Sequence, residues 1–252
     1  MSQRPTVIIG NWKMNKTIAE TRSFISGLAL AISEATAKIG IAVPFTSMAA
    51  ASQTAQDTLI KIGAQNISDF DEGAYTGEIS CKMIQDAGAS FALIGHSERR
   101  RLFHEDDALV NRKIKKALEW GVQPVFCIGE TLEEHQSGKA YDVLSRQMST
   151  GLKGLEANQI ESLLIAYEPV WAIGTNKAAT PDIVQETHAF CRAYLACEWG
   201  ERAANRVVIQ YGGSVSPANA DVLMRQPDVD GLLVGGASLS LDAFTKIMLM
   251  NC

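Results

Sequence analysis

The chain has 252 residues, of which 46% are hydrophobic and 20% are charged, and its formal net charge is −5. This length and composition allow a sizeable buried core, in two small domains or in one α/β barrel. The negative net charge argues against nucleic acid as a partner, because phosphate backbones are bound by clustered lysine and arginine. No run of about 18 apolar residues occurs, and the apolar stretch within the first ten residues is too short for a signal peptide, so we expect no membrane segment and a cytoplasmic protein.

Cysteine and histidine residues are spread along the chain without forming a motif. The five cysteines are odd in number and none belongs to a CxxC pair, so we interpret them as reduced thiols. The four histidines belong to no HExxH motif and no Cys/His cluster. We therefore expect no metal site.

Eight short apolar runs rich in β-branched residues recur along the chain. They cover residues 7–10, 39–43, 60–64, 91–95, 122–128, 163–167, 207–211 and 231–234. The first and last runs begin 224 positions apart, and division by seven intervals gives a mean period of 32. One β-α-β unit needs about 30 residues. The spacing therefore predicts parallel strands joined by helices.

Helical patterns fill the intervals between these runs. Apolar residues recur at steps of three and four over 18–32 and over 183–197, which gives each segment one face to pack on a sheet. Thr180 and Pro181 predict the start of the second helix, because they are a cap residue and a first-turn proline. No linker rich in Pro, Gly or Ser divides the chain, so we expect residues 1–252 to form one domain.

Eight strands that alternate with helices can close into a barrel or lie in an open, doubly wound sheet. An open sheet usually carries GxGxxG early in the chain, and this motif is absent. We therefore predict the fold class α/β and a single eight-stranded parallel β/α barrel. In such barrels the chemistry lies in the loops after the strands, and phosphate is bound after strands seven and eight.

Polar side chains follow the first predicted strand. On an extended chain Asn11 and Lys13 share a face, so both can point to the barrel mouth while Trp12 turns away. Lys13 would then supply a fixed positive charge. A solvated lysine at a strand end is the simpler interpretation of this residue alone.

The fourth predicted strand is followed by His96, Ser97 and Glu98. His96 precedes a helix start, where the helix dipole disfavours the imidazolium, so a neutral ring could act as an electrophile. A structural histidine is the alternative. Glu98 can pair with Lys13 or stabilise the dipole of its own helix.

The sixth run leads to Glu168, which is followed by the unusually apolar segment 169–173. If this segment were exposed, it would form an apolar patch on the surface. If it folded over a ligand, it would exclude water from the site. Desolvation would make Glu168 a stronger base. A solvated glutamate is the common alternative for a loop.

Paired glycines follow the last two runs. Gly212 and Gly213 follow the seventh run, and Gly235 and Gly236 follow the eighth. Glycine lets backbone N–H groups approach a ligand closely, and a helix N-terminus just beyond each loop would add positive potential. Either pair alone is typical of a tight turn. Because both lie in the loops that bind phosphate in such barrels, together they predict a phosphate site.

Five segments resemble the signature sequences of the triosephosphate isomerase family in order and spacing, and the resemblance covers essentially the whole chain. They are 11–15 (NWKMN), 95–100 (GHSERR), 167–175 (YEPVWAIGT), 211–215 (YGGSV) and 233–236 (LVGG). The resemblance implies a TIM barrel that interconverts dihydroxyacetone phosphate and D-glyceraldehyde 3-phosphate in glycolysis and gluconeogenesis. It also implies an enediolate intermediate and no metal or organic cofactor.

The resemblance further implies which residues act. The catalytic residues would be the base Glu168, the neutral hydrogen-bond donor His96, and Lys13 and Asn11 where negative charge develops. The substrate would be bound by Asn11, Lys13, Gly174, Ser214, Gly235 and Gly236. Supporting positions would be Ser97 and Glu98.

Two other features of the chain are interpreted through the family. Residues 69–81 resemble its protruding third loop, which inserts beside a partner's active site and makes a homodimer; a mobile surface loop is the alternative. The resemblance places Thr76 near the partner's Asn11 and the partner's Glu98. At the end of the expected lid, directly after Gly174 and Thr175, this chain has Asn176 where the family most often has glycine. Asparagine tolerates left-handed backbone angles, so we expect a hinge to survive there.

Two other functions remain open at this point. A Schiff-base aldolase needs a desolvated lysine nucleophile, and Lys13 is the one lysine that ends a predicted strand. A phosphate-binding protein without activity would be expected to lack Lys13, His96 or Glu168, and all three are present. The expected partners are a triose phosphate and a second copy of the chain, with no nucleic acid and no membrane.

Overall fold

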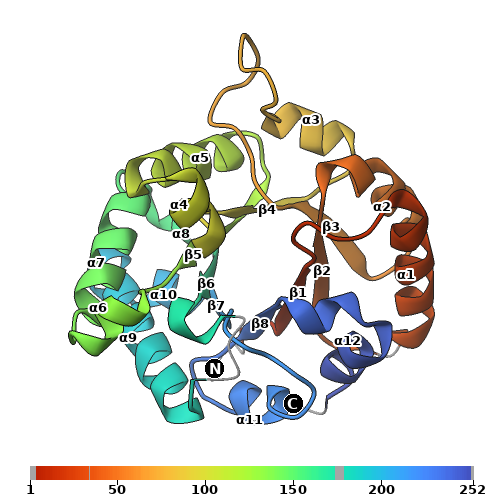
Figure 1. Ribbon diagram of the computed structural model, residues 1–252. Coiled ribbons are helices and arrows are strands. Elements are labelled where there is room, and N and C mark those ends of the chain that lie inside the picture. The colour runs from red at the N-terminus through yellow and green to blue at the C-terminus, as the bar shows by residue number, and fades with distance from the viewer. Residues whose placement is uncertain (1–3, 34, 174–178, 251–252) are drawn as a thin grey trace.

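The computed structural model describes residues 4–33, 35–173 and 179–250, and its centre is a closed barrel of eight parallel strands (Figure 1). Each strand pairs with the next one along the chain, and the last strand pairs with the first. The strands are β1 (Val7–Asn11), β2 (Lys38–Val43), β3 (Ile60–Ala64), β4 (Phe91–Ile94), β5 (Gln123–Ile128), β6 (Leu164–Tyr167), β7 (Val208–Tyr211) and β8 (Gly231–Val234). The predicted α/β barrel is confirmed, with strand ends that agree to within one residue.

Helices form a ring outside the strands (Figure 1). They are α1 (Ile18–Ala31), α2 (Met48–Thr54), α3 (Cys81–Asp86), α4 (Ser97–Phe103), α5 (Asp107–Glu119), α6 (Leu132–Gln136), α7 (Ala140–Gly151), α8 (Ala157–Ile160), α9 (Pro181–Trp199), α10 (Glu201–Ala204), α11 (Ala220–Met224) and α12 (Leu241–Met248). Three short 3₁₀ turns are η1 (Phe45–Ser47), η2 (Val170–Ala172) and η3 (Gly236–Leu239). In the described part of the chain, none of the helices has the length and apolar character needed to cross a membrane.

The two helices predicted from periodicity are α1 and α9. The side chain of Thr17 caps α1 in a capping box with Glu20, and the side chain of Thr180 accepts a 3.4 Å hydrogen bond from the N–H of Ile183 at the start of α9. The face that α1 buries consists of Thr21, Phe24, Ile25 and Leu28. These steps of three and four place the apolar side chains against the barrel.

Alternate side chains along the strands point into the barrel and form an inner core. Its members are Val7, Ile9, Ala42, Phe91, Leu93, Val125, Cys127, Leu164, Ala166, Val208 and Leu233. The ring of Phe91 fits because β3 has Gly63 beside it, where an added Cβ would overlap the ring. Side chains therefore fill the barrel, and the loops at its ends are left to bind ligands.

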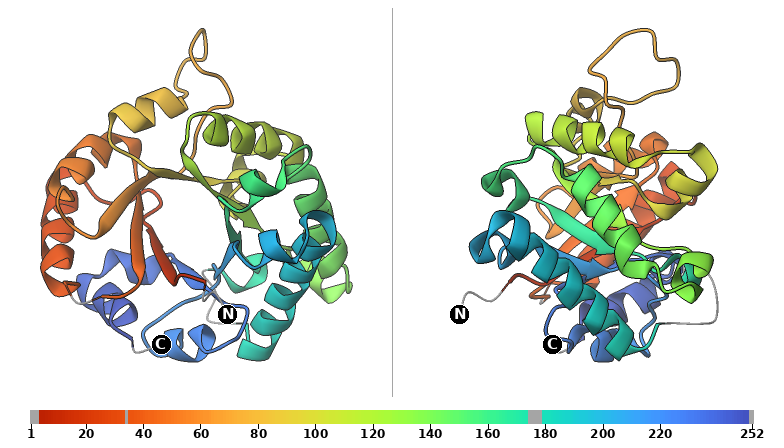
Figure 2. Two further views of the ribbon diagram at one scale, coloured as in Figure 1. Left: turned by 180° about the vertical axis from the view of Figure 1, so that it is seen from behind. Right: turned by 90° about the vertical axis from the view of Figure 1, so that its left-hand side faces the viewer.

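The connection between β3 and α3 projects from the barrel in every view (Figures 1 and 2). Its residues 65–80 contain neither helix nor strand, and the rings of Phe70 and Tyr75 stack with centroids 4.0 Å apart. Thr76 is exposed in this loop. Its expected role in a dimer stays a prediction.

The cysteines of the described residues are free thiols. Three of them, Cys81, Cys127 and Cys191, are buried, and Cys197 is exposed. Burial raises the pKa of the Cys191 thiol to about 12 and that of Cys81 to about 11, which makes both thiols unreactive. Cys252 lies outside the described residues.

We expect His188 on α9 to make the fold sensitive to acid. Its ring is fully buried, and burial lowers its pKa from 6.5 to about 4. The unfolded chain therefore binds this proton more readily, so the stability that His188 contributes is present above pH 6.5 and is lost as the pH falls towards 4. The free energy of unfolding should fall by about 3 kcal/mol across this window.

Urea unfolding at several pH values between 4 and 7 would measure this loss. The variant His188→Gln keeps a hydrogen-bond donor but has no ring to titrate, so its pH dependence should be shallower over the same window. If the free energy of unfolding fell as steeply with decreasing pH in the variant as in the parent, groups other than His188 would cause the acid sensitivity.

Candidate active site

The loops after the strands meet around a cavity of about 330 Å³. Its lining comes from the last residues of β1 and β8 and from the loops after β1, β4, β6, β7 and β8. The residues are Asn11, Lys13, His96, Glu168, Ile173, Gly212, Gly213, Ser214, Val215, Leu233, Gly235, Gly236 and Ala237. Pockets for small ligands commonly start at about 300 Å³. Among the described residues, the structure therefore brings seven predicted site residues together at this end of the barrel, whereas Thr76 lies in the projecting loop; the seven are Asn11, Lys13, His96, Glu168, Ser214, Gly235 and Gly236.

Glu168 directly follows β6, and its carboxylate lies between two donors from the β4 loop. Oε1 lies 3.0 Å from Nε2 of His96, and Oε2 accepts a 3.1 Å hydrogen bond from the backbone N–H of Ser97. Glu168 is only 2% exposed. Gly212 makes room for it, because a Cβ there would lie 2.8 Å from Cγ of Glu168. The carboxylate is thus held at the cavity wall by contacts that a side-chain rotation can break.

His96 is buried and caps α4 with its own ring. Nδ1 accepts a 3.2 Å hydrogen bond from the backbone N–H of Glu98, so Nδ1 carries a lone pair and the ring proton lies on Nε2. Burial lowers the pKa of this ring, but the charge and hydrogen bond of Glu168 outweigh burial and raise the pKa above its usual value. Nδ1 can accept this hydrogen bond only in a neutral ring, so the neutral His96 expected from the helix start stays a prediction that the contact with Glu168 opposes.

Lys13 reaches the cavity through a left-handed backbone turn, with φ of 51°. The expectation that Asn11 and Lys13 share a face of an extended chain is wrong, because β1 ends at Asn11. Oδ1 of Asn11 instead accepts a 3.0 Å hydrogen bond from the N–H of Lys13, and both line the cavity. Trp12 does turn away, as expected, and is fully buried. Strained backbone of this kind is typical of functional sites.

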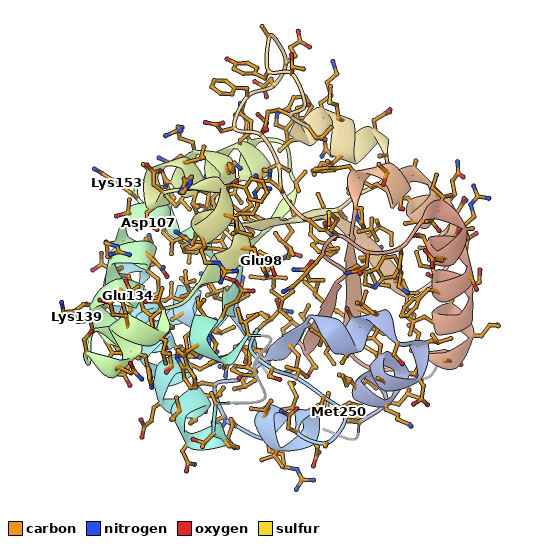
Figure 3. All side chains as sticks on the ribbon, in the orientation of Figure 1. Glu98, Asp107, Glu134, Lys139, Lys153 and Met250 are labelled. Carbon is orange, nitrogen blue, oxygen red and sulfur yellow. The ribbon has the colours of Figure 1, made fainter. Side chains whose placement is uncertain are left out.

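The ammonium of Lys13 is paired with Glu98, which is one of the two roles that the sequence left open for Glu98. Nζ of Lys13 lies 2.6 Å from Oε1 of Glu98, and both side chains are half-buried. Burial raises the pKa of Glu98, but the hydrogen bond and charge of Lys13 outweigh this effect and hold the pKa below its usual range. Glu98 lies inside the ring of helices (Figure 3). The pair holds the ammonium where the β1 and β4 loops meet.

Gly235 and Gly236 leave open space at the cavity. A Cβ on Gly236 would meet nothing within 4 Å, and one on Gly235 would meet only Cε of Lys13, at 3.8 Å. Neither residue has a positive φ. Gly235 has φ of −82° and ψ of −110°, a combination that residues with a Cβ rarely adopt, so its backbone itself favours glycine. The open space at Gly236 leaves room for a ligand to approach the N–H groups closely.

A helix start just beyond each pair of glycines is expected, and the structure has one after β8 but not directly after β7. After β8 the turn η3 begins at Gly236, but after β7 the next helix, α11, begins only at Ala220. The amide of Asn219 instead holds this loop, by donating a 3.0 Å hydrogen bond to the carbonyl of Ser214. Gly174 and Asn176 lie outside the described residues.

Two further polar residues hold the site together, and no motif points to them. Gln65, directly after β3, donates a 2.8 Å hydrogen bond to the carbonyl of Lys13. Glu130, two residues after β5, is fully buried and accepts hydrogen bonds from the hydroxyl of Tyr167 at 3.1 Å and from Nε1 of Trp171 at 2.7 Å. Both follow strands closely, so the rule that chemistry lies after strand ends could have identified them.

A closed parallel barrel whose titratable side chains gather at the carboxyl ends of the strands places this protein in the class of β/α-barrel enzymes. The model of the triosephosphate isomerase family matches residues 6–251. Triosephosphate isomerase of Protochlamydia amoebophila is 51% identical over 247 residues, which are 98% of this chain and 94% of the relative. The corresponding protein of Chlamydia trachomatis serovar D is 49% identical over 243 residues, or 96% of this chain and 88% of the relative.

A solved structure agrees with these relatives. The crystal structure of triosephosphate isomerase from Bartonella henselae matches with a TM-score of 0.87 and 41% identity, and covers 96% of this chain and 97% of that one. The chain belongs to the triosephosphate isomerase family and is an isomerase.

Proposed function

We propose that this protein interconverts dihydroxyacetone phosphate and D-glyceraldehyde 3-phosphate by proton transfer through an enediolate, as a step of glycolysis and gluconeogenesis. The observation that carries the proposal is the place of Glu168, a buried carboxylate in contact with Nε2 of His96 at the wall of a cavity that Lys13 and two open glycines also line. This arrangement offers a base, a hydrogen-bond donor and an anion-binding wall to one small ligand.

In the proposed mechanism Glu168 turns from its two donors to the substrate. It removes a proton from the carbon beside the carbonyl and returns it to the neighbouring carbon, so one base serves both directions. Nε2–H of His96 donates to the oxygens that become negative, and Lys13 and Asn11 stabilise the same charge. Once the carboxylate turns away from the ring, its charge and hydrogen bond no longer raise the pKa of His96 as strongly. The ring can then donate its hydrogen bond in the neutral form.

The phosphate group would be bound by Lys13, Gly174, Ser214, Gly235 and Gly236. The open space at Gly235 and Gly236 supports this assignment. The apolar segment 169–173 would cover the substrate and keep the enediolate dry, which would suppress loss of phosphate. The hydrogen bond of Trp171 with Glu130 would hold the start of this segment.

A coupled assay of D-glyceraldehyde 3-phosphate conversion tests the proposal directly. We expect turnover without added metal or cofactor, and the absence of turnover in folded protein would overturn the proposal. Borohydride treatment with dihydroxyacetone phosphate tests the aldolase alternative, which requires a covalent adduct on Lys13. We expect no adduct in the mass spectrum.

We also propose that the active protein is a cytoplasmic homodimer, in which residues 1–252 of each copy form one domain. A second cavity, of about 210 Å³, lies beside the first and is lined by residues that include Asn11, Glu98, Met14 and Phe103. Met14 is 95% exposed and Phe103 is 62% exposed. Such apolar side chains around a cavity favour a protein contact, and the projecting loop that carries Thr76 is the segment that fits it. The free thiols are consistent with the cytoplasm.

The variant Thr76→Arg should weaken this dimer. A long charged side chain would have to enter the partner's cavity, so we expect sedimentation to show a shift from about twice 27.2 kDa towards the mass of one chain. The matched control is Ser23→Arg, which adds the same side chain to an exposed position of α1. A dimer of unchanged affinity in Thr76→Arg would contradict the assignment of the loop.

A further inference from the structure

Lys16 has an unusual conformation for a residue in a surface loop. It follows Lys13 by three residues and also has a left-handed backbone, with φ of 73°. Its side chain is half-buried, and it folds back onto the barrel. Nζ donates a 3.1 Å hydrogen bond to the carbonyl of Leu239, and it lies 5.3 Å from the ring centroid of Trp12 and 4.5 Å from that of Phe24.

The carbonyl that Lys16 binds belongs to the turn that carries the open glycines. Leu239 is the last residue of η3, which begins at Gly236. The preceding carbonyl, that of Ser238, accepts a 3.1 Å hydrogen bond from Nε1 of Trp12. Two consecutive carbonyls of η3 are therefore bound by side chains from the loop after β1, which is also the loop that carries Lys13.

These contacts surround Lys16 with groups that attract a cation. The rings of Trp12 and Phe24 pack edge to face, with centroids 5.1 Å apart, and Nζ of Lys16 lies close to both. A glycine would suit the backbone angle of residue 16 better than lysine does. The presence of lysine therefore indicates that the ammonium contributes contacts that offset this strain.

We propose that Lys16 is a positioning residue for the phosphate group: by holding η3 against the β1 loop, it sets the distance between the ammonium of Lys13 and the N–H groups of Gly235 and Gly236. This inference rests on the proposed function, in which those groups bind phosphate together. Lys16 itself does not line the cavity, so it acts through the backbone that it holds.

The variant Lys16→Met tests this role, because methionine keeps most of the side-chain length but removes the charge and the donor. We expect the KM for D-glyceraldehyde 3-phosphate to rise on the order of tenfold, the effect of one charge-assisted hydrogen bond, with kcat within about twofold of the parent. The Kd of inorganic phosphate, measured by calorimetry, should rise by a similar factor. Lys16→Arg, which restores a cation, should recover most of this affinity.

A truncated substrate separates positioning of the phosphate from general damage. D-glyceraldehyde has no phosphate group, so its kcat/KM should be the same in Lys16→Met and the parent. The matched control is Lys38→Met, which removes an exposed lysine at the opposite end of the barrel, at the start of β2. This control should leave kcat/KM for both substrates and the Kd of inorganic phosphate unchanged.

Several results would overturn the inference. An unchanged Kd of inorganic phosphate in Lys16→Met would do so. An equal loss of kcat/KM for D-glyceraldehyde and for D-glyceraldehyde 3-phosphate would do so as well. If Lys16→Met folds poorly, Lys16→Gly replaces it, because glycine suits the backbone angle; phosphate affinity equal to the parent's would then overturn the inference. The calorimetric titration needs no turnover, so it separates failure of this inference from failure of the proposed isomerase reaction.

Discussion

Glu168→Asp is expected to lower kcat by on the order of 10²-fold in a barrel that remains folded. The substitution withdraws the carboxylate by about one methylene, roughly 1 Å, and a misplacement of this size costs a proton transfer about that factor. Glu168 is held through Nε2 of His96 at 3.0 Å and the N–H of Ser97 at 3.1 Å, and both contacts depend on the length of the Glu168 side chain.

Steady-state kinetics in both directions would measure this effect. Because a single base serves both directions in the proposed mechanism, the two kcat values should fall by similar factors. The Kd of inorganic phosphate should not change, since Glu168 is not among the residues proposed to bind the phosphate. Glu133→Asp, an equal truncation on the exposed face of α6, serves as the control. Turnover at the level of the parent protein would remove Glu168 from the role of base.

Lys13→Ala is expected to reduce kcat/KM by on the order of 10³-fold without unfolding the protein. In the proposed mechanism the ammonium contributes twice, because it binds the phosphate and stabilises the enediolate, and loss of one preorganised donor alone costs about 10² to 10³ in rate. The side chain is half-buried and its partner Glu98 can be solvated, so the loss of the ion pair should cost little stability. The pKa of Glu98 should rise, since Lys13 holds it down.

Lys13→Gly is the companion variant that separates activity from backbone strain. Both variants lose the ammonium, so both should be nearly inactive. Glycine adopts the φ of 51° at this position without a steric penalty, whereas alanine does not, so the glycine variant should be more stable by about 1 kcal/mol. Urea unfolding of the two variants measures the difference. Equal stability would contradict the strain at residue 13, and high activity in either variant would move Lys13 out of the site.

Much of the fold was accessible from the sequence because parallel barrel strands are buried on both faces. They are therefore read as short, continuous apolar runs, and the eight runs agree with β1 to β8 to within one residue. The start of α9 at Pro181 was predicted from its cap, which acts between neighbouring residues. Such signals are local, so a single sequence contains them.

The sequence also predicted which side chains gather at the cavity, since the carboxyl ends of parallel strands lie at one end of a barrel. It did not show how those side chains are oriented. The sequence suggests extended backbone at Lys13, where the structure has a left-handed turn, and it contains no sign that Glu168 raises the pKa of His96. Periodicity carries no information on either point.

The alternation of strands and helices, the barrel and the family can all be recognised in the chain alone, because they follow from hydrophobic periodicity and from short motifs. Two contacts appear only in the folded protein: Glu168 accepts a hydrogen bond from the N–H of Ser97, 71 positions away, and Lys16 donates one to the carbonyl of Leu239, 223 positions away. Such contacts exist because barrel closure brings the ends of distant strands within hydrogen-bonding distance. Their geometry is set by the packing of the whole ring and not by the local chain.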